Sequence, residues 1–307
     1  MRNLGFALLL VALLAAPVIG EDSSAGTAVK LSNPDANLPN QLLPQSINSR
    51  GDITGHIGDE HDGIGFLRTA DGQFQEFVFP GPCNQFYVSG CTYPQGINDR
   101  RQIVGFAVLA SGNEAFLREK NGDIVMLPHA PDNTPLQPNA INNRGDIVGS
   151  YGSFLHGFLL RKGNTIIIDF PGATSTVCTG VNNSGQITGW YIESNRSVHG
   201  FLWEDGNFIA NFQVIGNNGP ENTFPVAIND HGQVAINPLF SFQSPVTFIR
   251  NPDGTIITLN MRTLLQPIGG VEGQLVGIND RGDLVGLFFP NRSDIFGFLI
   301  PEGAPEP

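Results

Sequence analysis

Apolar and polar residues alternate along this chain in many short runs, separated by clusters of Gly, Pro, Asn and Asp. Alternation with a period of two is typical of half-buried β-strands, whereas amphipathic helices repeat every three to four residues. Three successive runs of this kind lie at 186–191, 199–203 and 208–212. No helical periodicity of useful length occurs, and 38 Gly and 22 Pro suit short strands joined by many turns. The pattern therefore predicts an all-β protein.

One short phrase, a β-branched apolar residue followed by Asn, recurs six times at intervals of 40 to 50 residues. Successive Asn residues are 50, 44, 40, 47 and 50 positions apart, and such intervals match the period of a four-stranded propeller blade. Each repeat contains up to four strand-like runs, which we call a, b, c and d in chain order, and the Asn stands between a and b. The spacing predicts six blades, with turns at Asn48, Asn98, Asn142, Asn182, Asn229 and Asn279.

The Asn begins a tight turn, and five of the six repeats place Gly three residues later. An Asn side chain can bond the backbone two residues on, and Gly accepts the positive φ that such turns need. The second repeat has Arg101 at the Gly position, where a left-handed backbone costs about 1 to 2 kcal/mol. We therefore expect that turn to take a different form.

Strand c carries a Phe in every repeat, 16 to 19 residues after the Asn. One large aromatic residue at all equivalent positions predicts a repeated core pocket rather than a ligand platform. Truncating one such Phe to Ala should cost roughly 3 to 5 kcal/mol. The six residues are Phe66, Phe116, Phe158, Phe201, Phe248 and Phe298.

The connections divide each predicted blade between two faces. Tight turns join a to b and, through pairs such as Asp71-Gly72 and Asp205-Gly206, c to d. The b to c and d to a connections are longer and differ between repeats, and in a meander they share the opposite face. We call this the variable face, and we expect binding residues on it because loops of varied sequence commonly carry function.

The sixth repeat ends after strand c, and residues 27–31 lie where a strand d would precede the first repeat. We infer that residues 27–31 pair beside residues 296–300, which leaves no open edge between the two ends of the ring. The sequence thus predicts a six-bladed β-propeller of four-stranded antiparallel blades, closed by an N-terminal strand that joins the last blade.

The chain resembles the secreted bacterial repeat proteins of the HAF family, which carry extracellular repeats with a His-Ala-Phe step. The resemblance covers almost all of the chain after residue 20, and it rests on the Asn turns, on Pro-Gly phrases such as 170–172 and on steps close to His-Ala-Phe. No repeat spells that step in full; the nearest are His156-Gly157-Phe158, His199-Gly200-Phe201 and Glu114-Ala115-Phe116. The resemblance implies export and a repeat fold, and it brings no established reaction and no catalytic residues.

Residues 1–20 read as a secretory signal peptide, with Arg2 ahead of an apolar stretch at 4–16 and a cleavage site at 18–20. That stretch is shorter than the roughly 20 residues that a spanning helix needs. We expect cleavage between Gly20 and Glu21, no membrane span, and a single propeller domain at 21–307. The mature protein should be periplasmic or fully secreted.

Acidic residues outnumber basic ones by 28 to 16, which gives a formal net charge of −12. Removal of the signal peptide takes away Arg2 and leaves 15 basic residues against 28 acidic ones, a charge of −13. Nucleic-acid binding rests on clustered Lys and Arg, so this balance argues against such a partner. We expect a monomer without a cofactor.

Three Cys residues would meet an oxidising compartment after export. Cys83 and Cys91 flank a short loop and are the natural pair, which leaves Cys178 free. That small ring would contribute about 2 to 3 kcal/mol by chain entropy. The alternative pairing, Cys91 with Cys178, would link successive blades through equivalent linkers.

The densest polar cluster, on the first b to c loop, contains His56, Asp59 and His61. These residue types bind divalent cations, but their spacing matches no metal motif, so they are weak metal candidates. No Gly-x-Ser-x-Gly setting, Ser-His-Asp arrangement or carboxylate pair stands out. The sequence therefore nominates no catalytic residue.

Aromatic and basic residues on the variable face suit sugar stacking or a protein contact. Our leading hypothesis is a secreted, non-catalytic binding or scaffold propeller for an extracellular glycan or protein. The alternative is a polysaccharide-active hydrolase or lyase, which needs titratable groups with shifted pKa values converging at the channel mouth. Besides the polar cluster, the ligand-binding candidates are Phe86, Tyr87, Trp190, Tyr191, Arg196 and Arg292.

Overall fold

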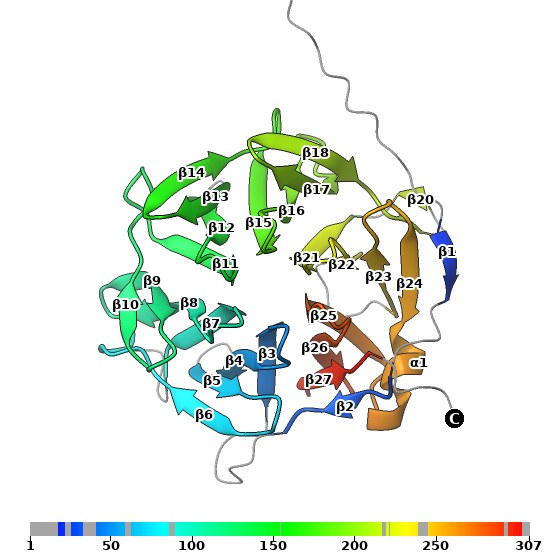
Figure 1. Ribbon diagram of the computed structural model, residues 1–307, viewed down its shortest axis with the longest axis horizontal. Helices are drawn as coiled ribbons and strands as arrows, with labels where there is room; N and C mark the ends of the chain where they lie inside the picture. The colour runs from blue at the N-terminus through cyan, green and yellow to red at the C-terminus, as the bar shows by residue number, and fades with distance from the viewer. Residues whose placement is uncertain are drawn as a thin grey trace, which may run out of the picture.

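The computed structural model describes residues 18–21, 26–32, 41–58, 63–85, 90–153, 155–216, 219–220, 222–238, 245–291 and 294–302. These residues form six antiparallel β-sheets arranged as blades around a central channel (Figure 1). In the first five blades strand a lies at the channel, and the chain then runs outward through b and c to d. The predicted six-bladed propeller is confirmed.

The first three blades each contain one repeat. The first blade is β3 (Leu42–Ile47), β4 (Ile53–Ile57), β5 (Ile64–Arg68) and β6 (Phe74–Phe77). The second blade is β7 (Thr92–Ile97), β8 (Ile103–Leu109), β9 (Gly112–Arg118) and β10 (Ile124–Met126). The third blade is β11 (Leu136–Ile141), β12 (Ile147–Tyr151), β13 (His156–Arg161) and β14 (Asn164–Ile168).

The fourth and fifth blades are separated by a small hairpin of β19 (Ile215–Gly216) and β20 (Gly219–Pro220). The fourth blade is β15 (Ser175–Val181), β16 (Ile187–Ile192), β17 (Val198–Glu204) and β18 (Asn207–Phe212). The fifth blade is β21 (Phe224–Ile228), β22 (Val234–Asn237), β23 (Val246–Arg250) and β24 (Ile256–Asn260). A further strand, β1 (Val18–Glu21), runs parallel to β24 at its outer edge.

The sixth blade draws on both ends of the chain. Its inner strands are β25 (Glu272–Ile278), β26 (Leu284–Phe289) and β27 (Phe296–Ile300), and its outermost strand is β2 (Val29–Lys30). β2 pairs with β27 in antiparallel register, and the Leu31 N–H extends the ladder by donating to the Gly297 carbonyl at 2.9 Å. The side chains of Ala28 and Leu31 are buried against the ring. The N-terminal segment therefore supplies the strand that the last repeat lacks.

The a to b turns share one form, including the turn that lacks Gly. Arg101 adopts a φ of 61°, and its N–H donates to the Asn98 carbonyl at 2.9 Å. Our expectation of a different turn was wrong. The Arg101 Nε and Nη2 groups donate to the buried Asp52 carboxylate of the first blade at 2.8 and 3.3 Å, and this charged pair offsets the backbone cost.

A short helix joins the fifth and sixth blades: α1 (Met261–Leu265), followed by the 3-10 turn η1 (Gln266–Ile268). The sequence pattern did not predict it, because five residues are too few for helical periodicity to show. The Asn260 side chain caps α1 by accepting from the Thr263 N–H at 3.2 Å. Across the described ranges, no helix has the length and apolar character to cross a bilayer.

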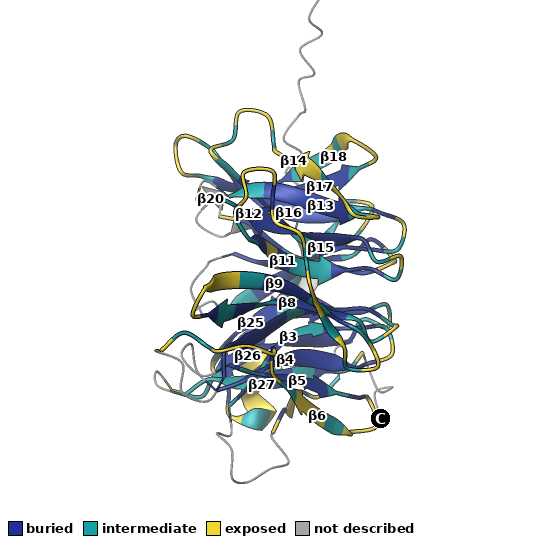
Figure 2. Ribbon diagram, turned by 90° about the vertical axis from the view of Figure 1, so that its left-hand side faces the viewer, coloured by how far each residue is buried: buried dark blue, intermediate teal, exposed yellow. Residues whose placement is uncertain are grey.

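The repeated Phe residues lie in the core, as their recurrence predicts. Five of them are completely buried, and Phe248 is 4% exposed. The core fills the spaces between blades, where for example Leu159 of the third blade packs with Ile187 of the fourth. Seen from the side, buried strands form the body of the disc and exposed loops lie on both of its faces (Figure 2).

Candidate functional site

The six turn Asn residues form a closed ring of hydrogen bonds at one mouth of the channel. In the third blade, Asn142 Oδ1 accepts from two backbone N–H groups of its own turn at 2.9 and 3.0 Å. Its Nδ2 donates to the Asp146 carboxylate at 3.1 Å and to the Asn182 carbonyl of the next blade at 3.0 Å. The interblade bond recurs in every blade at 2.9 to 3.2 Å, and the last one returns from Asn279 to the Asn48 carbonyl. The Asn thus joins blades as well as shaping turns.

The residues directly after each Asn form a second ring around the same mouth. Five of their six backbone N–H groups donate to the equivalent side chain of the next blade. Three of these side chains are carboxylates, and each also accepts from a neighbouring Asn or Ser side chain. The cavity at this mouth has a volume of only about 70 Å³, so we do not place a ligand here. The six residues are Ser49, Asp99, Asn143, Asn183, Asp230 and Asp280.

Every strand a carries a β-bulge three residues before its Asn. The register between strands a and b shifts at this point in all six blades. A bulge re-aims its extra residue, and all six of these residues line the channel. We call them the bulge ring: Gln45, Gln95, Asn139, Thr179, Val226 and Val276.

Sequence reasoning missed the bulge ring, although a signal for it exists. In four repeats a Pro directly precedes the bulged residue, at Pro44, Pro94, Pro138 and Pro225. A Pro within an inner strand removes a ladder hydrogen bond and so indicates a bulge. The residue types of the ring differ between repeats, and a search for recurring residues therefore passes over them.

The main cavity, of about 410 Å³, lies in the channel toward the variable face. We call it the channel-mouth cavity. Its polar side is formed by bulge-ring amides of the first three blades, Gln45, Gln95 and Asn139. The other three blades contribute its apolar residues, which include Trp190 and Phe224, whose rings meet edge to face with centroids 5.7 Å apart. They also contribute the polar side chains of Thr179, Asn237 and Gln274.

The polar groups of this cavity fall into two classes. Asn139 Nδ2 donates to the Cys178 carbonyl, Thr179 Oγ1 to the Pro225 carbonyl and Asn237 Nδ2 to the Leu275 carbonyl, each at 2.9 Å, so all three tie neighbouring blades together. Gln45 and Gln95 are half-buried, and their side chains make no hydrogen bond within the described part of the chain. Their amides can each donate and accept, and they are the groups available to a ligand.

The described lining of this cavity is uncharged. It includes no carboxylate, His, Lys, Arg, Cys, Ser or Tyr, so these residues supply no general acid or general base, and none of them could activate the Thr179 hydroxyl as a nucleophile. Among the residues that the structure describes, no group of three or more His, Cys, Asp or Glu could hold a metal ion. The arrangement can hold an uncharged ligand through amide hydrogen bonds and apolar contact.

Of the predicted ligand candidates, Trp190 lines the channel-mouth cavity. Tyr191, the next residue in β16, is 2% exposed and stacks on Phe170 with ring centroids 3.7 Å apart. Burial raises the pKa of the Tyr191 hydroxyl to about 12. We therefore correct Tyr191 to a core residue, because successive side chains of a strand point to opposite faces. Arg196 is exposed in the b to c turn of the fourth blade.

The other predicted candidates are placed only in part. His56 is 8% exposed in β4 and meets Tyr93 edge to face, with ring centroids 5.0 Å apart. It therefore packs against strand a of the second blade instead of standing on a loop tip. Asp59, His61, Phe86, Tyr87 and Arg292 lie outside the described residues, and their roles remain predictions.

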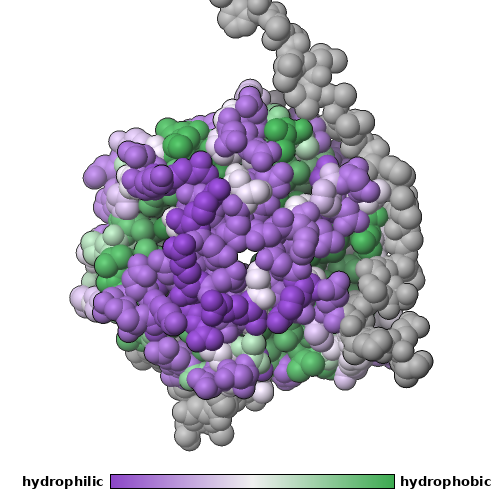
Figure 3. Space-filling view, viewed as in Figure 1, coloured by the Kyte–Doolittle hydropathy of each residue, from purple (hydrophilic) through white to green (hydrophobic). Residues whose placement is uncertain are grey.

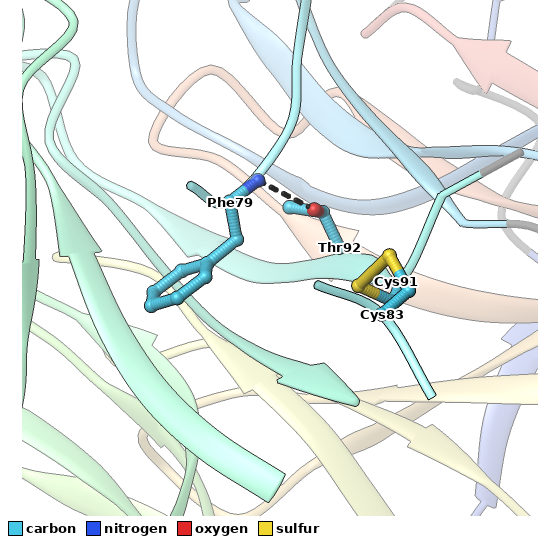
Figure 4. The surroundings of a disulfide bond; sticks show 4 residues. All are labelled: Phe79, Cys83, Cys91 and Thr92. Atoms are coloured by element: carbon cyan, nitrogen blue, oxygen red, sulfur yellow. Dashed lines mark hydrogen bonds between the residues drawn. A yellow bond between two sulfur atoms is a disulfide. The ribbon is translucent and has the colours of Figure 1, made fainter. Parts of the chain in front are cut away.

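Cys83 and Cys91 form the preferred disulfide (Figure 4). Cys178 is a buried free thiol. The alternative pairing of Cys91 with Cys178 was wrong. The bridge lies in the d to a connection between the first two blades, beside the bond from the Phe79 N–H to Thr92 Oγ1 at 2.8 Å. It therefore fixes the base of a variable-face loop. Burial raises the pKa of the Cys178 thiol, which makes this Cys a poor nucleophile.

No protein-family model and no curated protein matches the sequence. Virginiamycin B lyase from Staphylococcus aureus, in an inactive mutant with quinupristin, shares 11% identity over 89% of this chain and 99% of its own, with a TM-score of 0.51. A gluconolactonase-like protein shares 11% identity over 92% and 93%, with a TM-score of 0.53. A mutant of AofleA from Arthrobotrys oligospora shares 12% over 94% and 91%, also with a TM-score of 0.53. These likenesses show the propeller fold alone.

Proposed function

We propose that this chain is a secreted, non-catalytic binding propeller that takes part of an extracellular glycan into the channel-mouth cavity. The observation that carries the proposal is the pairing of two unengaged amides, Gln45 and Gln95, with an apolar wall in a cavity whose described lining has no titratable group. A sugar offers hydroxyls that both donate and accept, together with C–H faces that pack on aromatic rings. The volume of about 410 Å³ falls within the range of roughly 300 to 1,000 Å³ that small-ligand sites occupy.

The signal-like residues 1–20 and the resemblance to HAF repeats support export to the periplasm or the medium. The Cys83–Cys91 disulfide is compatible with such an oxidising compartment. We propose membership of that repeat family on the same sequence features. In the other form of this hypothesis, the variable face binds an extracellular protein instead of a glycan.

The test is a screen of the purified mature protein on a glycan array, followed by calorimetry with the best ligand. The double variant Gln45→Ala/Gln95→Ala should bind that ligand about 5- to 150-fold more weakly, because each of two lost hydrogen bonds is worth about 0.5 to 1.5 kcal/mol. Gln75→Ala, which removes an exposed amide from the outer strand β6, is the matched control and should bind like wild type. Equal binding by the double variant would contradict the site.

An extracellular polysaccharide-active enzyme is the second candidate. One observation favours it: His156 Nδ1 lies 2.8 Å from Asp169 Oδ2 on the third blade, as in a base held by its orienting acid. Release of reducing ends or unsaturated sugars from polysaccharides, abolished in His156→Ala, would establish this function. Binding without turnover would favour the first proposal.

A further inference from the structure

A second cavity of about 410 Å³ lies at the seam between the second and third blades. Its residues come from strands b and c of the second blade, the connection between the two blades, strand a of the third blade and the b to c loop that follows. It shares no lining residue with the channel-mouth cavity. We call it the seam cavity, and it also belongs to the variable face.

One wall of the seam cavity is a fixed aromatic ring. Phe106 is half-buried and stacks on Tyr93, with ring centroids 5.2 Å apart and an interplanar angle of 18°. This contact holds the ring in place while Phe106 lines the cavity. Leu136, which is 1% exposed, and Pro135 continue the apolar surface. A ligand with an apolar face can therefore pack here without reordering the wall.

The polar part of the seam cavity is formed by three side chains, those of Asn113, Gln137 and Ser153. All three are exposed, and none makes a hydrogen bond within the described residues. Each is uncharged and can both donate and accept. They come from β9, β11 and the loop after β12, so folding of two blades is needed to bring them together.

The charges around the cavity are negative or paired. A Cβ placed on the lining residue Gly152 would lie 3.4 Å from Asp132 Oδ2, so this carboxylate borders the cavity. The hydroxyl and backbone N–H of Thr134 donate to Asp132 and lower its pKa, which keeps it ionised at neutral pH. Glu114 is paired with His129 Nε2 at 3.2 Å. With a net charge of −12 on the whole chain, anionic ligands are repelled.

We propose that the seam cavity is a second binding site, for an uncharged saccharide that packs on Phe106 and hydrogen-bonds Asn113, Gln137 and Ser153. The site goes beyond the proposed function because it uses different residues, and it stands even if the channel-mouth cavity binds nothing. Two sites on one face would let a single polysaccharide chain or a glycan-coated surface be held at two points, which raises avidity.

The test uses cellopentaose, laminaripentaose, xylopentaose and mannopentaose as neutral probes, with tetragalacturonate and an uncharged pentapeptide for comparison. Binding to the mature protein is measured by calorimetry and ligand-observed NMR. We expect at least one neutral probe to bind and Asn113→Ala/Gln137→Ala to weaken it at least tenfold. Asn164→Ala, which removes an exposed amide from the first residue of β14, is the control and should have no effect. Thermal unfolding of each variant verifies the fold.

Three results would overturn the proposal: no neutral probe binds, the double variant binds like wild type, or only tetragalacturonate or the peptide binds. The variant Gln45→Ala/Gln95→Ala separates this proposal from the channel-mouth site. Binding lost only in that variant would contradict the seam site and support the proposed function. Binding lost only in Asn113→Ala/Gln137→Ala would support the seam site and contradict the channel-mouth site.

Discussion

At the scale of single residues, the turn Asn uses the full capacity of its side chain. The Asn142 amide oxygen accepts from its own turn, while the amide nitrogen donates both to Asp146 and to the next blade. Asp could not make the two donor bonds, Ser has one donor instead of two, and Gln is one methylene longer. The residue type therefore follows from the geometry of the ring, and its six recurrences need no functional explanation.

Replacing this Asn by Asp should lower the free energy of unfolding, and by more in some blades than in others. In Asn142→Asp the new carboxylate faces the carboxylate of Asp146 and the Asn182 carbonyl, so we expect a loss of about 3 kcal/mol or more in the free energy of unfolding. In Asn182→Asp the residue four positions after the mutated one is Gln186, whose amide can turn and donate. That variant should lose clearly less. Urea unfolding of both at pH 7 measures the difference, and equal losses would contradict the assigned bonds.

Arg101 combines an unfavourable left-handed backbone conformation with a favourable ion pair to the buried Asp52. Burial by itself would raise the pKa of Asp52, but hydrogen bonds from Arg101, Asn48 and the Ala70 N–H outweigh it and lower that pKa. A carboxyl whose pKa is lowered on folding stabilises the fold at pH values above its ordinary pKa of about 3.9. This stabilisation is lost as the pH falls through the lowered pKa.

We therefore expect Arg101→Gln to be less stable than wild type at pH 7, by about 1 to 3 kcal/mol, because a buried carboxylate loses its cation. The difference should shrink as the pH is lowered below about 4. Melting temperatures between pH 7 and pH 3 test this. Arg100→Gln, at the neighbouring exposed position, serves as the control, and a gap that is constant with pH would argue against the ion pair.

At the scale of elements, repetition decides what the sequence can reveal. Strands, turns and core Phe residues recur in kind, so comparing the repeats predicted the blades, the two faces and the missing outer strand. The bulge ring escaped because its members range from Gln to Val. Tyr191 was misplaced because the side of a strand that meets the channel depends on register, and neighbours such as Trp190 and Tyr191 look alike until that register is known.

The strand β2 offers the clearest test of an element. Deleting residues 26–32 would expose the edge of β27 and remove the buried Ala28 and Leu31 side chains. We expect a loss of several kcal/mol, since burial of one Leu alone is worth about 1.5 to 3 kcal/mol. A variant that begins at residue 26 is the matched control and should melt like the mature protein. If the variant that lacks residues 26–32 melted at the same temperature as this control, β2 would contribute nothing to closure of the ring.

At the scale of the whole molecule, polarity is sorted along the channel. Figure 3 shows one face, on which hydrophilic side chains surround the central opening while hydrophobic patches lie toward the rim. The turn mouth carries three carboxylates within its second ring, whereas the described lining of the channel-mouth cavity is uncharged. This sorting could not be predicted from the sequence, because it depends on which residues the bulges aim inward.

An uncharged site has a consequence for the pH dependence of binding. Between about pH 5.5 and pH 8 the titrating side chains are mainly His, whose ordinary pKa is about 6.5, and none lines the channel-mouth cavity among the described residues. Affinity for a neutral glycan should therefore change less than about twofold over this range. Calorimetry at three pH values tests this, and a bell-shaped profile would indicate an acid–base site instead.

The closed ring of Asn hydrogen bonds also bears on how such a gene can change. Arrays of similar repeats gain and lose copies readily by recombination, and a new repeat of this kind could fold well against its neighbours. Each Asn amide, however, spans one fixed gap to the next turn. An added or deleted repeat would alter the radius of the mouth and strain every one of these bonds together. The ring should therefore disfavour any change from six repeats, whereas it places no such constraint on the loops of the variable face.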